Sequence, residues 1–282
     1  MISIKEKPGR DCFIIARRIV PGYRIPAWYD SRMARPLVVG NWKLYVESLA
    51  EGKRLVRDID RKLPRRLEAT AVICPPVPFA AALRAGYGGK RLKFGAQDAS
   101  DEVEGAHTGE SSPRALAKSG IEYVILGHSE LRARGETNEM VAKKAAAVLA
   151  ERLVPIICVS ERERDPNAVY LTEFAKDIAG SLARVEPSAA SRIIIAYEPS
   201  WAIGGEEPPL PRAITEMTVF VRKTLAGMWG RDAAFRTRVI YGGSINTENA
   251  PALAKDAEID GVLVGHHSVE ADAFADIIRA FS

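Results

Sequence analysis

Residues 36–43 read PLVVGNWK, a short apolar run that breaks into polar residues. A strand that is apolar throughout its length is typical of a parallel sheet covered on both faces by helices. Seven further runs of this kind follow, at 71–74, 92–96, 123–126, 155–159, 192–197, 238–241 and 261–264. Together with residues 36–42 they predict eight strands.

Amphipathic stretches lie between these strands. Apolar residues recur at spacings of three, four and seven in segments 55–63, 141–149, 174–185 and 214–228, which predicts helices with one buried face. Ser112-Pro113 indicates a helix N-cap followed by proline in the first turn. Eight strand–helix units favour an α/β protein with a single (β/α)8 barrel domain. A doubly wound sheet is the alternative, but no G-x-G-x-x-G follows the first strand.

Composition excludes several classes of protein. The chain has 282 residues, of which 47% are hydrophobic and 27% charged, as in a globular protein rather than a disordered or collagen-like one. No run approaches the roughly 18 apolar residues of a membrane span. The three cysteines, at 12, 74 and 158, have no C-x-x-C spacing, and there are four histidines. We therefore expect no disulfide framework, no metal site and a reducing, cytoplasmic location.

The positive charge is concentrated at the start of the chain. Residues 1–35 hold eight Lys and Arg against three acids, a charge of +5, so the total of +4 leaves −1 for residues 36–282. This balance gives no support to nucleic-acid binding. We interpret residues 1–34 as an N-terminal extension, with Met33 as a candidate natural start, and 35–282 as the barrel domain. An Arg-rich targeting peptide is the alternative, although acidic residues interrupt it.

Reacting groups in such barrels come from the carboxyl ends of the strands. The first predicted strand runs into Lys43, the fourth into His128, and the sixth into Glu198. Glycines follow the seventh and eighth strands. One lysine, one histidine and one glutamate are therefore predicted to face a common mouth beside two glycine turns.

Several segments resemble the triosephosphate isomerase family, in that family's order. They are 40–43 (GNWK), 95–97 (GAQ), 108–110 (TGE), 125–130 (ILGHSE), 196–199 (AYEP), 201–204 (WAIG) and 241–244 (YGGS). The resemblance covers essentially all of 36–282 and implies a TIM barrel. It also implies an isomerase of glycolysis and gluconeogenesis that interconverts dihydroxyacetone phosphate and D-glyceraldehyde 3-phosphate.

The resemblance assigns the proton-transfer groups. Glu198 is the expected base, because a partly desolvated carboxylate can take a proton from a carbon next to a carbonyl. His128 stands where a helix should begin, and the family's histidine is neutral and donates to the substrate carbonyl. Ordinary structural roles for the two residues, a buried salt bridge and a backbone contact at a strand end, are the alternatives.

The remaining site residues are predicted to bind charge and phosphate. Lys43 is expected to stabilise the phosphate and the developing oxyanion, with Asn41 and Glu130 as its supports. Glu130 also fits the preference of a helix's first turn for acids. Backbone N–H groups that would hold the phosphate are expected at Gly243, Ser244, Gly265 and, in a closing lid, Gly204.

No metal or organic cofactor is implied. The loop 107–113 resembles the family's projecting loop, which places Thr108 near Asn41 and Lys43 of a neighbouring subunit. A homodimer with a small phosphorylated sugar as substrate is therefore expected.

Three departures from the family pattern affect the substrate prediction. The usual GTGKTA of the lid is replaced by GGEEPP at 204–209, the usual Gly-Gly is Gly265-His266, and Leu131 stands where the family has arginine, with Gly135-Glu136 one residue early. An aldose–ketose isomerase acting on a tetrulose phosphate, such as L-erythrulose 1-phosphate, is therefore an alternative. A non-catalytic barrel with a binding role is a third reading, which would predict loss of the reacting residues first.

Overall fold

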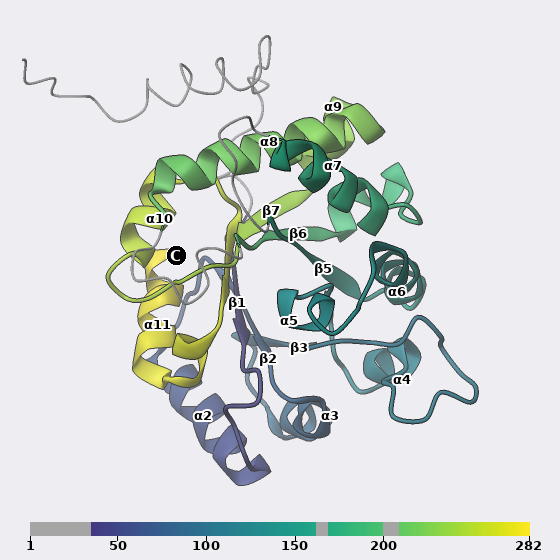
Figure 1. The fold of residues 1–282 in the computed structure, drawn as a ribbon. Helices are drawn as coiled ribbons and strands as arrows, with labels where there is room; N and C mark the ends of the chain where they lie inside the picture. Colours follow the sequence, from purple (N-terminus) through teal and green to yellow (C-terminus); the bar gives the residue numbers. More distant parts are fainter. Residues whose placement is uncertain (1–34, 162–168, 200–208) are drawn as a thin grey trace, which may run out of the picture.

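The computed structural model describes residues 35–161, 169–199 and 209–282. Within these ranges, eight parallel strands form a closed barrel in the order β1 to β8, as Figure 1 shows. The strands are β1 Leu37–Asn41, β2 Thr70–Cys74, β3 Leu92–Ala96, β4 Tyr123–Leu126, β5 Val154–Val159, β6 Ile194–Tyr197, β7 Arg238–Tyr241 and β8 Gly261–Val264. Leu37 pairs with Thr70 on one side and with Gly261 on the other, so β1 closes the ring.

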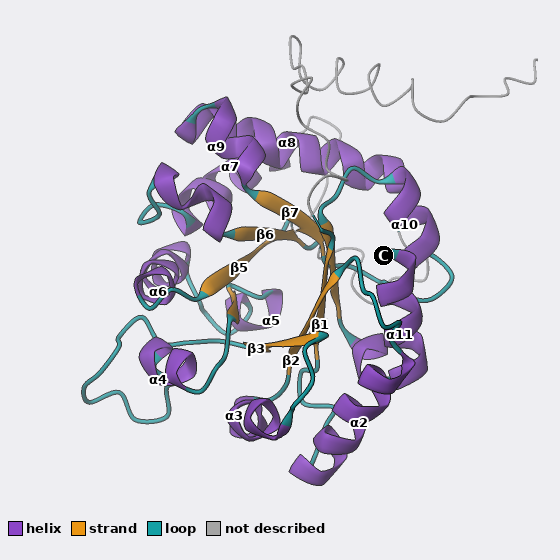
Figure 2. Cartoon of the chain, turned by 180° about the vertical axis from the view of Figure 1, so that it is seen from behind, coloured by secondary structure: helices purple, strands orange, loops and turns teal. Residues whose placement is uncertain are grey.

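Helices surround the ring of strands, as the view from behind in Figure 2 shows. They are α2 Leu49–Lys62, α3 Val77–Gly86, α4 Pro113–Lys118, α5 Ser129–Arg132, α6 Asn138–Ala150, α7 Tyr170–Ser181, α8 Pro211–Trp229, α9 Arg231–Arg236, α10 Ala250–Asp256 and α11 Ala271–Ala280. Short 3-10 helices occupy Pro187–Arg192 and His266–Val269. None of the helices in the described ranges has the length and apolar character needed to cross a bilayer.

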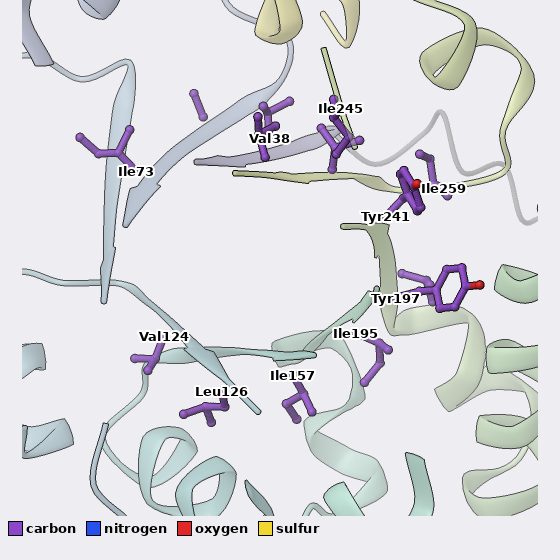
Figure 3. Packing of buried hydrophobic residues seen from close by; sticks show 14 of the residues in the cluster. Val38, Ile73, Val124, Leu126, Ile157, Ile195, Tyr197, Tyr241, Ile245 and Ile259 are labelled. Atoms are coloured by element: carbon purple, nitrogen blue, oxygen red, sulfur yellow. The ribbon is translucent and has the colours of Figure 1, made fainter. Parts of the chain in front are cut away.

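Two buried layers follow from the alternation of side chains along the strands. The outer layer packs strands against helices and includes Val38, Leu126 and Ile157. Figure 3 shows Leu126 and Ile157 pointing away from the ring of strands. The inner layer includes Leu37 and Val39, and in the described part of the chain all of its buried residues lie on strands. This layer therefore fills the interior of the barrel.

The predicted barrel is confirmed, and the element boundaries differ by a few residues. The first strand spans 37–41 rather than 36–42. The sixth begins at Ile194 rather than Arg192, because Pro187 starts a 3-10 turn that ends at Arg192. The helix expected over 174–185 ends at Ser181. The cap at Ser112 is confirmed, since its hydroxyl accepts the N–H of Ala115.

Candidate active site

The inward-facing positions of the strands place the side chains of the candidate site. Ile194 and Ala196 face the interior, and two residues later Glu198 continues the same alternation. Its backbone N–H still donates to the carbonyl of Val159 at 2.9 Å, so the ladder extends to this position. Asn41 stands in the same relation to Leu37 and Val39. The last inward-facing side chain of each of these strands therefore lies at the mouth of the barrel.

Lys43 is held at the mouth by three separate contacts. Its own N–H donates to Asn41 Oδ1 at 3.1 Å, its carbonyl accepts Gln97 Nε2 at 2.9 Å, and its Nζ lies 2.8 Å from Glu130 Oε1. The backbone at Lys43 has φ +45°, in the left-handed region that is uncommon for residues other than glycine. Asn41 and Gln97 therefore stabilise a strained backbone that directs the ammonium group.

Glu130 is an ionised partner for this lysine. Burial raises the pKa of the Glu130 carboxyl, but the hydrogen bond and charge of Lys43 outweigh it and hold that pKa below its ordinary value. The side chain is half exposed, at 56%. Exposed ion pairs contribute little to stability, so this pair acts mainly by orienting the ammonium group.

His128 is the N-cap residue of α5, as expected from the sequence. Its Nδ1 accepts the backbone N–H of Glu130 at 3.3 Å. A ring nitrogen that accepts a hydrogen bond carries no hydrogen, so this geometry corresponds to the neutral imidazole with its hydrogen on Nε2. That Nε2 lies 3.5 Å from Glu198 Oε1. The only donor of the ring is thus directed into the mouth.

Glu198 is a buried carboxyl group with an unused oxygen. The residue is 3% exposed, and among the described residues its Oε2 has no hydrogen-bond partner. Burial raises the pKa of the carboxyl, while His128, the Ser129 N–H and Lys43 oppose that shift without cancelling it. A buried, underused carboxylate of raised basicity, beside a ring donor and an ammonium group, is suited to proton transfer.

Glycines replace side chains at the ends of β7 and β8. A Cβ at Gly242 would lie 2.9 Å from Glu198 Cγ, so glycine makes room for the glutamate. A Cβ at Gly243 would lie 2.0 Å from Tyr241 Oη. At Gly265 the closest atom to such a Cβ among the described residues would be Lys43 Cε, at 3.8 Å, so this position borders the lysine. Ser244 lies in the same turn, where its carbonyl accepts Asn249 Nδ2 at 2.8 Å.

Comparison with known proteins agrees with this geometry. The sequence model described as triosephosphate isomerase matches residues 36–281. The chain belongs to the triosephosphate isomerase family. A triosephosphate isomerase of Chloroflexus aurantiacus is 38% identical over 249 residues, covering 88% of this chain and 99% of the relative. The triosephosphate isomerase of Roseiflexus sp. is 39% identical, covering 88% of this chain and 98% of the relative. That of Thermus thermophilus is 38% identical, covering 88% of this chain and 99% of the relative.

The expectation of an aldose–ketose isomerase, an intramolecular oxidoreductase of the triosephosphate isomerase type, is confirmed at the level of the family. The structure brings together Asn41, Lys43, His128, Glu130 and Glu198. Gly204 and most of the altered lid segment lie outside the described residues.

His266 is exposed at the end of β8, where its ring meets Tyr45 edge-on at 5.1 Å and its Nε2 lies 3.3 Å from Glu270 Oε1.

Three residues of this isomerase site received no role from the sequence. Gln97 bonds both the Lys43 and Cys74 carbonyls, Gly242 makes room for Glu198, and Arg132 bonds the carbonyl before His128. Gln97 follows the end of β3 as Glu198 follows the end of β6, so the rule of inward strand ends could have found it. No comparable sequence signal predicts the hydrogen bonds of Arg132.

Proposed function

We propose that this protein interconverts dihydroxyacetone phosphate and D-glyceraldehyde 3-phosphate by proton transfer through an enediolate. The observation that supports this most strongly is the pairing of a buried Glu198 carboxyl with the His128 ring, whose Nε2 lies 3.5 Å from Glu198 Oε1. The other oxygen of this carboxyl is unused among the described residues. The family membership supplies the reaction class, and the geometry supplies the groups that the reaction needs.

The proposed steps balance without any cofactor. The Glu198 carboxylate takes a proton from the hydroxymethyl carbon of the ketose, and the electron pair of that C–H bond moves to form the enediolate. His128 Nε2–H donates to the oxygen that becomes negative, and Lys43 stabilises the charge. The hydroxyl proton on the first carbon's oxygen passes, through the His128 ring, to the oxygen of the former carbonyl. Glu198 then returns its proton to the carbon of that former carbonyl, which gives the aldose.

The phosphate is assigned to the turns after β7 and β8. Backbone N–H groups at Gly243, Ser244 and Gly265 would hold it, and Gly204 would add another from the lid. The position of Gly265 next to Lys43 supports this assignment, because an anion held by the Gly265 backbone would lie near an ammonium group.

A tetrulose phosphate such as L-erythrulose 1-phosphate is the second candidate substrate. The observation that favours it is His266, which follows Gly265 and bridges Tyr45 and Glu270 at the edge of the proposed phosphate site. A side chain here alters the boundary of the substrate space, whereas the reacting groups are unchanged. The intact grouping of Glu198, His128 and Lys43 argues against a barrel that only binds.

A purified-protein assay tests these substrates side by side, with Glu198→Gln as the control for contaminating isomerase. Fast turnover of dihydroxyacetone phosphate that depends on Glu198 supports the proposal. Weak triose turnover with strong tetrulose turnover would transfer it to the second candidate. Absence of Glu198-dependent turnover on both substrates would refute both.

We further propose a homodimer formed through the loop 107–113. Thr108 is exposed in this loop, and Leu44, beside the catalytic lysine, is 81% exposed. An apolar side chain so exposed next to the site is consistent with a surface that another subunit covers. The cytoplasmic location stays a prediction.

A further inference from the structure

Arg132, at the end of α5, has a guanidinium group that contacts four acceptors. Its Nε donates to the Gly127 carbonyl at 2.8 Å, and its Nη1 donates to Asn138 Oδ1 at 2.7 Å. Its Nη2 donates to Ser181 Oγ at 2.9 Å and to the Cys158 carbonyl at 3.3 Å. A planar guanidinium can satisfy acceptors in several directions at once, which a lysine ammonium on its flexible stem cannot.

These contacts fix the backbone on both sides of His128. The side chain of Arg132 holds the carbonyl before the histidine, and its backbone N–H donates to the His128 carbonyl at 3.0 Å. Gly127 turns through φ +68°, and a Cβ there would lie 2.9 Å from Arg132 Nη2. The guanidinium therefore packs directly against the turn that presents the histidine.

The same guanidinium reaches the strand that supports Glu198. It bonds the carbonyl of Cys158 on β5, and the Cys158 side chain is hydrogen-bonded to the Glu198 carboxyl. The next residue, Val159, accepts the Glu198 N–H. Arg132 thus connects the end of β4, which presents His128, with the end of β5, which supports Glu198.

The anchors of Arg132 are themselves fixed. Ser181 is fully buried and its hydroxyl donates to Asn138 Oδ1 at 3.1 Å, while Asn138 Nδ2 donates to Asp177 Oδ1 at 2.8 Å. The guanidinium is consequently tied to α6 and α7 as well as to the two strand ends. Such supporting contacts hold reacting groups within the small tolerances that catalysis needs.

We propose that Arg132 is a positioning residue for the isomerisation, which sets the separation of His128 Nε2 and the Glu198 carboxyl without touching substrate. This inference rests on the proposed roles of His128 and Glu198. Its consequence is a loss in the chemical step rather than in substrate binding, since the phosphate turns lie on β7 and β8. Displacements of about 1 Å at reacting groups can cost about two orders of magnitude in rate.

The chain offers a matched control in Arg222. This buried arginine also bonds two carbonyls and a side chain, namely those of Ala234, Thr237 and Asp260. Thr237 and Asp260 directly precede β7 and β8, so the group lies at the opposite end of the barrel from the site. Arg222→Lys therefore disturbs a comparable network away from the reacting groups.

The test measures kcat, KM and the thermal unfolding midpoint for three variants: Arg132→Lys, Arg222→Lys and Glu198→Gln. Each assay uses folded protein purified by gel filtration, at a temperature well below the unfolding midpoint of that variant. For Arg132→Lys we expect kcat to fall at least about tenfold with KM nearly unchanged. For Arg222→Lys we expect a lower midpoint with unchanged kcat. If Arg132→Lys lowers the midpoint and leaves kcat at the wild-type value, the arginine is only structural and the inference is wrong.

A second variant covers the case in which Arg132→Lys does not fold. Asn138→Ala removes one anchor and leaves the arginine in place, and we expect kcat to fall about threefold or more with KM unchanged. Wild-type kcat in that variant would then overturn the inference. Glu198→Gln distinguishes failure of the inference from failure of the proposed function. If Glu198→Gln abolishes turnover while Arg132→Lys keeps the wild-type kcat, only the inference is wrong. If Glu198→Gln turns over like the wild type, the proposed function is wrong and the inference with it.

Discussion

Single residues at the barrel mouth act through the space they leave as well as through their side chains. Gly242 gives room to the Glu198 side chain, and Gly127 allows the turn from β4 into His128. Sequence reasoning could propose the reacting residues, since they follow strand ends and lie in recognisable strings. It could not assign Arg132, because that role depends on contacts with α6, α7 and β5 that no local spacing encodes.

Gly127→Ala is expected to destabilise the protein more than Gly120→Ala. Both glycines have positive φ, at +68° and +77°. A Cβ at Gly127 would lie 2.9 Å from Arg132 Nη2 and 3.0 Å from Val141 Cγ2, whereas among the described residues a Cβ at Gly120 would meet the flexible Arg84 side chain, at 3.3 Å. Left-handed backbone costs an alanine about 1–2 kcal/mol, and crowding adds about 1–3 kcal/mol. Urea unfolding measures both variants, and equal losses would contradict the crowding argument.

Glu198→Gln is expected to stabilise the protein near pH 8. The raised pKa of Glu198 means that, above it, the folded state holds a carboxylate that burial disfavours, whereas the unfolded state solvates it. As pH falls through the raised pKa, the folded group gains a proton before the unfolded one does, and this cost disappears. Glutamine carries no charge at any pH, so the variant's advantage in unfolding midpoint should shrink as pH falls.

Thermal unfolding of wild type and Glu198→Gln from pH 8 to pH 4.5 checks this prediction. A variant that is less stable than wild type at pH 8 would contradict it. The same shift places the acidic limb of kcat/KM at a higher pH than the ordinary pKa of a glutamate, because the base is active only when it is ionised.

At the scale of elements, the apolar strands were predictable because each must be buried on both faces. All eight appear, and their register follows from the closed ring. Their boundaries were less predictable, as the 3-10 turn Pro187–Arg192 before β6 illustrates. Period-two alternation explains why Asn41, Gln97 and Glu198 face one mouth, so much of the site follows once the strands are in register.

The contacts between α8 and the starts of β7 and β8 are expected to contribute stability without affecting turnover. Arg222 Nη2 lies 2.6 Å from Asp260 Oδ2, and both residues are buried. Removing one partner of a buried pair typically costs about 3–5 kcal/mol. Asp260→Ala should therefore lose about that much in denaturant unfolding while the folded protein keeps the wild-type kcat. A kcat that falls together with stability would contradict the separation of the two ends of the barrel.

At the scale of the whole molecule, the proposed dimer makes the loop 107–113 part of the site. Sedimentation should give about twice the chain mass of 30.8 kDa. Replacing residues 107–111 by a short Gly/Ser linker should give a species of the chain mass with reduced turnover, because Leu44 and the segment around Lys43 lose their cover. A wild-type protein that sediments as a monomer at full activity would refute the dimer.

The central claim is that Glu198 moves a proton through an enediolate at this mouth. The most direct measurement is isomerisation in D₂O, with deuterium at the product carbon followed by NMR for wild type and Glu198→Gln. An acid that exchanges its proton with solvent should give deuterated product in wild type, and turnover should fall by at least about two orders of magnitude in the variant. A variant that turns over and labels like wild type would contradict the claim.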